Sequence, residues 1–292
     1  MSIEIRTDDL APTTAVLYSR GVRLLKSARF TIERFASRDG CVNARAAPFD
    51  LVFRGPAADC ITRHIYRLGS HEPHITRYLL DHVRLAENDV ALDVGANIGW
   101  YSVILSRLSS PRAKIFSFEP DPTTYQLLTR NLEVNVAHNV TAVNCALGEE
   151  AGYATLHQYK KSNNGRHSLL STNFSGGTTV RVPVDTLEAF WVRQGLESRQ
   201  LRFLKIDVEG FEYQVLRGAG DLLRRCACIH LEYSPDAFTA AGIQREAVLD
   251  IIFSAGFDAQ AFVGQELVPV SYGELATAQA QLDLILTPKY CP

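Results

Sequence analysis

The stretch from Val90 to Leu105 most constrains how this chain can fold, because its pattern is that of a buried strand, a tight glycine turn and the start of a helix. Apolar residues that favour strands surround Asp93, while Gly95 and Gly99 allow backbone angles that other residues avoid. From Trp100 onward the apolar residues change to helical spacing. A strand, glycine turn and helix in an alternating chain is typical of the nucleotide-binding crevice of α/β proteins.

The residues of this turn also predict the kind of ligand. A dinucleotide site needs the pattern G-x-G-x-x-G, and here Asn97 and Trp100 stand in place of its second and third glycines. The turn therefore lacks the glycine backbone that a bound pyrophosphate needs. The next strand, Lys114 to Phe118, is followed by Glu119, which stands where an acidic residue binds a ribose diol. A ligand with ribose but no phosphate fits best, and S-adenosylmethionine is such a ligand.

Composition narrows the class of protein. The 292 residues are 46% hydrophobic, enough for one α/β core with an extension, and 30 basic against 32 acidic residues offer no general attraction to nucleic acid. No apolar run reaches the roughly 20 residues of a membrane span, and no signal-peptide core is present, so we expect no transmembrane segment and a cytoplasmic location. The six cysteines lack paired CxxC spacing, which favours reduced thiols over a zinc site.

The segment from Thr13 to Arg38 has the pattern of a basic amphipathic helix. We expect its apolar side to pack on the body of the protein and its basic side to face solvent. The alternatives are a helix that binds a membrane surface or a partner, including a second copy of the chain. Residues 1–60 are then an N-terminal extension of helix and strand, and residues 61–292 form the main domain.

Beyond the glycine turn, strands and helices alternate with short connections, which predicts a mostly parallel sheet. One polar, glycine-bearing stretch, Lys160 to Gly177, interrupts this order. We expect it to be a lid over the substrate, with a mobile surface insert as the alternative. His71, Glu72 and His74 lie at the start of a predicted helix, where ligand contact and ordinary helix capping explain them equally well.

Five motifs together resemble the FkbM family of S-adenosylmethionine-dependent methyltransferases. They span about residues 65 to 235 and are Leu92-Asp-Val-Gly-Ala-Asn-Ile-Gly-Trp-Tyr-Ser102, Phe118-Glu-Pro120, Asn144-Cys-Ala-Leu-Gly148, Val184-Asp-Thr-Leu187 and Lys205-Ile-Asp-Val-Glu-Gly-Phe-Glu212. The resemblance implies an α/β, Rossmann-like, seven-stranded sheet with an antiparallel last strand. It also implies O-methylation of a hydroxyl on a small molecule such as a sugar, a glycolipid or a polyketide-type product. The cofactor contacts that it implies are Asp93, Gly95, Ala96, Asn97, Gly99, Glu119, Pro120, Cys145, Ala146 and Asp207.

Methyl transfer from a sulfonium needs an aligned acceptor and a modest general base. The candidate catalytic residues are Asp207, Glu209, Glu232, His167 and His230, several of which also have a structural explanation as helix caps or core polar groups. Asp207 and Glu232 offer oxygen ligands for Mg²⁺, which is the alternative role for this pair.

Three other functions remain as alternatives. A non-catalytic partner protein that binds S-adenosylmethionine would need Glu119 but not the carboxylates near Asp207. A nicotinamide-dependent oxidoreductase would share the crevice, but its glycine pattern is missing. Base methylation in nucleic acid is disfavoured because no basic footprint is evident.

Overall fold

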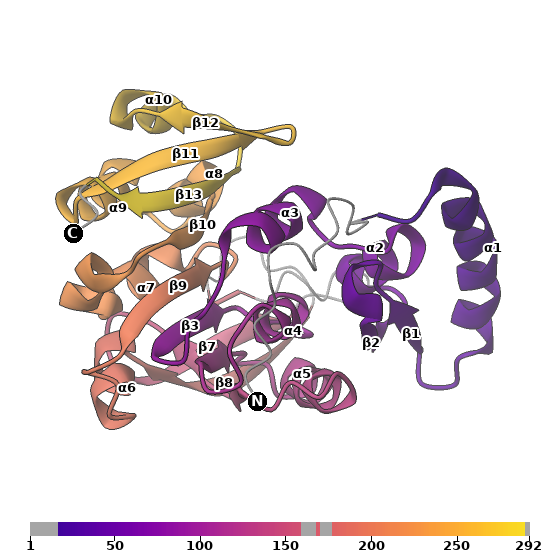
Figure 1. The fold of residues 1–292 in the computed structure, drawn as a ribbon. Coiled ribbons are helices and arrows are strands. Elements are labelled where there is room, and N and C mark those ends of the chain that lie inside the picture. Colours follow the sequence, from indigo (N-terminus) through magenta and orange to yellow (C-terminus); the bar gives the residue numbers. More distant parts are fainter. Residues whose placement is uncertain (1–16, 159–167, 170–176, 290–292) are drawn as a thin grey trace.

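The computed structural model describes residues 17–158, 168–169 and 177–289, and its centre is an eight-stranded sheet (Figure 1). The strand order is β12-β11-β13-β10-β9-β3-β4-β5. The bounds are β3 (Asp89–Val94), β4 (Lys114–Phe118), β5 (Val140–Val143), β9 (Gln200–Ile206), β10 (Ile229–Tyr233), β11 (Phe257–Val263), β12 (Glu266–Val270) and β13 (Leu282–Pro288).

The strand directions confirm the predicted fold class. Strands β5, β4, β3, β9 and β10 pair in parallel, and β13 is antiparallel to both β10 and β11. The expected seven strands are all present, but the sheet carries one more. Strand β12 pairs with β11 in a hairpin at the edge of the sheet, where its side chains are partly or fully exposed. The strand has the short apolar run Leu267-Val-Pro-Val270, but a proline within such a run argues for an edge strand or against a strand.

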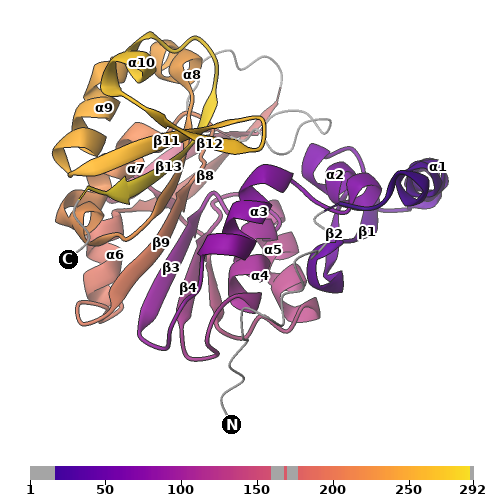
Figure 2. The same ribbon diagram turned by 45° about the horizontal axis from the view of Figure 1, so that its top comes forward.

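Helices cover both faces of this sheet, as Figure 2 shows. On one side lie α3 (Pro73–His82), α4 (Trp100–Arg107) and α5 (Pro122–Val134), and on the other α6 (Leu187–Arg193), α7 (Glu212–Ala219) and α9 (Arg245–Ser254). The short helices α8 (Pro235–Ala240) and α10 (Tyr272–Thr277) accompany the last strands. Strand β3 is buried along its length and alternates between the layers: Val90, Leu92 and Val94 join one core cluster, and Ala91 joins the other.

A small second sheet follows β5, with the order β6-β8-β7. Its strands are β6 (Ala146–Leu147), β7 (Gly152–Gln158) and β8 (Thr178–Asp185). The predicted lid, Lys160 to Gly177, lies outside the described residues except for Ser168, Leu169 and Gly177. Ser168 bridges to His157 of β7 and donates a 2.8 Å hydrogen bond to the carbonyl of Glu209, so this point of the segment lies against the turn after β9.

The N-terminal part contains α1 (Arg20–Ala36), β1 (Cys41–Arg45), a 3-10 turn (Pro48–Asp50), β2 (Val52–Pro56) and α2 (Cys60–Leu68). Strand β2 begins only at Val52, because Phe49 and Asp50 before it adopt left-handed backbone angles (φ 55° and 50°). Asp59 caps α2, since its side chain accepts a 2.9 Å hydrogen bond from the Thr62 amide.

On its side away from β1, strand β2 is joined to α5 by asparagine side chains rather than by another strand. Asn135, the C-cap of α5, accepts from the Val52 amide (3.0 Å) and donates to the Val52 carbonyl (2.7 Å). Asn131 makes the same pair of bonds with Arg54, at 2.8 and 3.0 Å. Each amide group thus satisfies a backbone donor and acceptor that would otherwise be unpaired.

The expectation that the apolar side of α1 packs on the body is wrong. Phe30 is the buried residue of this helix and packs edge-on against Tyr66 of α2 (ring centroids 5.1 Å apart), while Leu24, Leu25, Ile32 and Phe35 are exposed. The contacts with α2 on the opposite side, of which this aromatic pair is one, set the rotation of the helix. Among the described residues, no helix is both long and apolar enough to cross a membrane.

Candidate functional site

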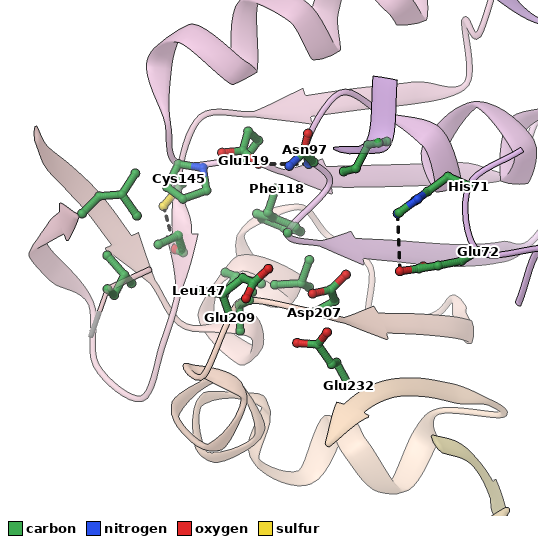
Figure 3. A pocket seen from close by; sticks show the side chains of 18 of the residues that line it. His71, Glu72, Asn97, Phe118, Glu119, Cys145, Leu147, Asp207, Glu209 and Glu232 are labelled. Atoms are coloured by element: carbon green, nitrogen blue, oxygen red, sulfur yellow. Dashed lines mark hydrogen bonds and ion pairs between the residues drawn. The ribbon is translucent and has the colours of Figure 1, made fainter. Parts of the chain in front are cut away.

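A cavity of about 390 Å³ lies at the carboxyl ends of the parallel strands (Figure 3). Its walls come from the turn after β3, from Glu119 and Pro120 after β4, from residues 145–147, and from the residues that follow β9. Glu232 of β10 and the segment before α3 complete it. The crevice predicted from the glycine turn is therefore present, at the position where open α/β sheets bind their ligands.

The glycine turn is shaped by its contact with Asp207, which follows the neighbouring strand β9. Gly95 has a φ of 80°, and a Cβ added there would meet the carbonyl oxygen of Asp207 at 1.8 Å, so a side chain has no room. Asn97 also adopts a left-handed conformation (φ 49°), and its side chain accepts a 2.8 Å hydrogen bond from the Ile98 amide. The turn presents backbone and an amide side chain to the cavity, with no glycine at the position that would approach a pyrophosphate.

Glu119 is held in place by two backbone donors. One carboxylate oxygen accepts from the Asn97 amide and the other from the Asp121 amide, both at 2.9 Å. Burial raises the pKa of Glu119 to about 8, against the opposing effect of these donors. Each oxygen keeps a further lone pair, so the carboxylate has the acceptors that the two hydroxyls of a ribose need. The residues present thus fit the nucleoside part of S-adenosylmethionine.

Lys205 connects the two strands that form the floor of the cavity. Its side chain is 2% exposed, and Nζ lies 3.1 Å from Asp207 Oδ2, 3.7 Å from Asp93 Oδ1 and 3.3 Å from the Gly95 carbonyl oxygen. Burial lowers the pKa of Lys205, but Asp207 and Asp93 outweigh this effect and raise it above its usual value. The lysine is a buried cation that fixes Asp207 and the glycine turn together.

Carboxylates gather at the other end of the cavity, where Asp207, Glu209 and Glu232 lie near one another in Figure 3. The turn that carries the first two is held by Glu212, which accepts from the amides of Val208 (3.1 Å) and Gly210 (3.0 Å). Burial, followed by repulsion from Asp207 and other carboxylates, raises the pKa of Glu232 well above its usual value. Glu232 is therefore a strong proton acceptor whenever it is ionised.

His71 and Glu72 also line this end of the cavity. Glu72 accepts a hydrogen bond from the Tyr101 hydroxyl, and its other oxygen lies 3.4 Å from His71 Nε2. His71 Nδ1 is buried and has no hydrogen-bond partner among the described residues. From the sequence, both residues were expected at the start of a helix. They were not among the catalytic candidates, because helix capping explains such residues equally well.

The structure brings together most of the predicted site residues. Those that line the cavity are Gly95, Asn97, Glu119, Pro120, Cys145, Ala146, Asp207, Glu209 and Glu232. Asp93, Ala96 and Gly99 lie behind this surface: Asp93 is fully buried and accepts a 2.6 Å bond from Ser102. His230 is also buried, with Nε2 3.2 Å from Asp283, and does not line the cavity. His167 lies outside the described residues.

One member of the pair suggested for Mg²⁺ has a charged partner in this structure, because Asp207 Oδ2 lies 3.1 Å from Lys205 Nζ. Within residues 17–158, 168–169 and 177–289, no three histidine, cysteine or acidic side chains form a group that would hold a metal ion. The alternative role of Asp207 and Glu232 as ligands of Mg²⁺ stays a prediction.

Comparison with known proteins places this geometry in a family. The model of the methyltransferase FkbM domain matches residues 93–259, which is more than half of the chain and includes most of the cavity. The chain belongs to the FkbM methyltransferase family. The family resemblance inferred from the five motifs is thus confirmed.

Curated relatives in this family include the methyltransferase sdnD of Sordaria araneosa, which is 33% identical over 175 residues (50% of this chain, 66% of its own length). The 31-O-demethyl-FK506 methyltransferase FkbM of Streptomyces tacrolimicus is 31% identical over 49% of this chain and 64% of its own. The 2-O-methyltransferase NoeI of Sinorhizobium fredii is 27% identical over 59% and 74%. The chain thus spans slightly less than two thirds of sdnD and FkbM.

The buried lysine of this FkbM-family site gives a prediction about stability. Lys205→Met should lower the free energy of unfolding by about 3–5 kcal/mol, because it leaves Asp93 and Asp207 without their cation. Denaturant titration followed by circular dichroism measures the change. Lys114→Met is the matched control, since that lysine is exposed at the start of β4. A Lys205→Met protein as stable as the wild type would contradict the role assigned to this lysine.

Proposed function

We propose that this protein transfers a methyl group from S-adenosylmethionine to a hydroxyl of a small hydroxylated acceptor, such as a sugar, a glycolipid or a polyketide-type product. The observation that carries the proposal is a cavity at the ends of the parallel strands that has Glu119 at one end and a group of carboxylates at the other. Membership of the FkbM family supports it, as do the names of the relatives FkbM and NoeI, which both specify an oxygen position.

We assign the cofactor to one end of the cavity and the acceptor to the other. Glu119 and Asn97 would hold the ribose, and residues 145–147 with Phe118 would enclose the base, in a part of the cavity with apolar walls. Asp207, fixed by Lys205, belongs to the carboxylate end of the cavity. The acceptor would then lie among His71, Glu72, Glu209 and Glu232. Carboxylates and an imidazole are suitable partners for several hydroxyl groups, which favours a polyhydroxylated acceptor.

The chemistry asked of the protein is modest. Bound S-adenosylmethionine supplies a methyl group that its sulfonium already activates. The residues of the cavity have to orient the acceptor oxygen and remove its proton. We propose that Glu232 removes the proton of the acceptor hydroxyl. Its raised pKa brings its basicity closer to that of a hydroxyl, and its position in the cavity allows contact with the acceptor. Glu209 and His71 are the alternative proton acceptors.

A direct test uses S-adenosylmethionine with an isotopically labelled methyl group and a panel of hydroxylated metabolites. Mass spectrometry should find the label on the oxygen of a product. If S-adenosylhomocysteine binds but no panel member is labelled, the result favours the alternative of a non-catalytic binding protein. Tight binding of NAD in calorimetry would favour the nicotinamide-dependent alternative and contradict the proposal.

The assignment of Glu119 predicts a loss of cofactor affinity. Glu119→Ala should weaken S-adenosylhomocysteine binding about ten- to a hundredfold for each hydrogen bond lost to the ribose, because bonds to a charged acceptor contribute about 1.5–3 kcal/mol. Calorimetry measures the affinity, and a melting curve checks that the variant is folded. The exposed Glu150→Ala is the matched control. Unchanged affinity would refute the assignment.

The raised pKa of Glu119 adds a dependence on pH. Two ribose hydroxyls donate to the ionised carboxylate better than to the protonated form, so binding should release a proton below the pKa. Affinity for S-adenosylhomocysteine should therefore increase as the pH rises toward about 8 and then level off. In Glu119→Gln, which has no proton to release, calorimetry should find a much flatter profile. An equally steep profile in that variant would assign the titration to another group.

The assignment of Glu232 predicts a separation of catalysis from cofactor binding. Glu232→Gln should lower kcat about a hundredfold or more, the usual contribution of a general base, while S-adenosylhomocysteine affinity stays unchanged. Glu266→Gln on the exposed edge strand is the matched control, and Glu209→Gln tests the alternative. Full turnover by Glu232→Gln would exclude this residue as the base.

A further inference from the structure

Helix α1 exposes an apolar stripe on the side that faces away from the rest of the protein. Leu24, Leu25, Ile32 and Phe35 are 69%, 74%, 70% and 84% exposed, so none of the described residues covers them. Their spacing of three to four residues, together with Ala28, places them along one side of the helix. Figures 1 and 2 both show α1 at the outer edge of the molecule, beyond α2. An apolar stripe of this length is unusual on a surface exposed to water.

The stripe points outward because the opposite side of α1 is fixed to α2. Phe30 packs against Tyr66, Lys26 Nζ lies 5.5 Å from the centre of the same ring, and Ser27 Oγ accepts a 3.0 Å bond from Arg67. These contacts use the more polar side of the helix. The rotation that they set leaves the apolar residues without a partner.

Basic side chains border the stripe on both sides. On a helix of 3.6 residues per turn, Arg20 and Arg34 follow one edge and Arg29 follows the other. The helix contains five basic residues and one acidic residue, Glu33, which is already paired with Arg29 at 2.6 Å. This charge contrasts with the whole chain, whose formal charge is −2.

A cavity beside α1 adds to this positive charge. It lies between α1, the β1–β2 pair and α5, has a volume of about 650 Å³, and is lined by Lys26, Arg29, Arg45, Arg54 and Arg130. Among the described residues that line it, the only acidic one is Glu33, which pairs with Arg29. Arg45 and Arg54 pair with Asp50 and Asp39 outside the lining, which leaves Lys26 and Arg130 as the excess positive charge. The cavity borders the stripe on the Arg29 side. Apolar surface and excess positive charge thus occur together on one side of the extension.

We propose that α1 binds the surface of an anionic lipid bilayer, with its apolar stripe inserted at the level of the headgroups and its arginines in contact with acidic lipids. A helix that lies in a membrane interface has this combination of apolar residues and flanking basic residues. Pairing with a second copy is less favourable, because it would bring together two helices that each carry five basic residues and one acidic residue. The proposal is independent of the methyl-transfer reaction.

The test is co-sedimentation of the full chain with vesicles. The wild type should sediment with vesicles of phosphatidylcholine and phosphatidylserine, much less with phosphatidylcholine alone, and less as salt is added. Ile32→Glu with Phe35→Glu should weaken this binding at least tenfold. Val192→Glu, at an exposed apolar position on α6, is the matched control and should bind like the wild type. Arg20→Gln, Arg29→Gln and Arg34→Gln combined should also weaken binding about tenfold or more.

Circular dichroism melting checks that every variant is folded, since all the substituted side chains are exposed. Failure of the wild type to sediment with anionic vesicles would overturn the proposal, as would equal binding to neutral vesicles. Light scattering measures the oligomeric state of the chain and so tests the alternative of self-association. A dimer that Phe35→Glu dissociates, without vesicle binding by the wild type, would assign the stripe to a second copy of the chain.

Discussion

The buried cation of Lys205 is the interaction on which the site depends. It lies where β3 and β9 run side by side, and its contacts with Asp93, Asp207 and the Gly95 carbonyl join the residues that follow both strands. A buried lysine is costly unless its charge is matched, and here two carboxylates match it. The main chain of Asp207 leaves no space for a side chain at Gly95, because a Cβ there would meet the Asp207 carbonyl oxygen at 1.8 Å. The ion-pair network and this close approach together determine the shape of the turn and the position of Asp207 in the cavity.

The two ends of the cavity differ in their chemical properties. The Glu119 end offers hydrogen-bond acceptors beside apolar walls, and its carboxylate is fixed by backbone amides that do not depend on side-chain packing. The acceptor end has several carboxylates in a confined space, which raises the pKa of Glu232 through burial and mutual repulsion. Fixed hydrogen-bond acceptors suit recognition of a constant ligand, and a carboxylate with a raised pKa suits proton transfer. The proposed roles of the two ends follow from this difference.

The parts of the structure that were predictable are those that depend on local sequence. The strand and turn around Asp93 and Gly95, the acidic residue at Glu119 and the cap at Asp59 each have a short-range signature, and the structure shows all of them. Other features depend on residues far apart in the chain. The pairing of Lys205 with Asp93, the closure of the cavity by His71 and Glu72, and the position of His230 behind it are set by strand order and helix packing. The outward rotation of α1 depends on its contacts with Tyr66 and Arg67 of α2.

Helix α2 links the two surfaces to which we assign a function. Cys60 and Ile61 at its start line the cavity, whereas Tyr66 and Arg67 near its end contact α1. The β2 strand before it is held to α5 by the paired bonds of Asn131 and Asn135, and Asn131 also donates to the carbonyl of Ile98 in the glycine turn. The N-terminal part is thus connected to the cavity and to the glycine turn by short, direct contacts. With α1 on a bilayer, these contacts would hold the cavity at a fixed height above the lipid, so an acceptor anchored in the same membrane would reach it only through a polar headgroup of matching length.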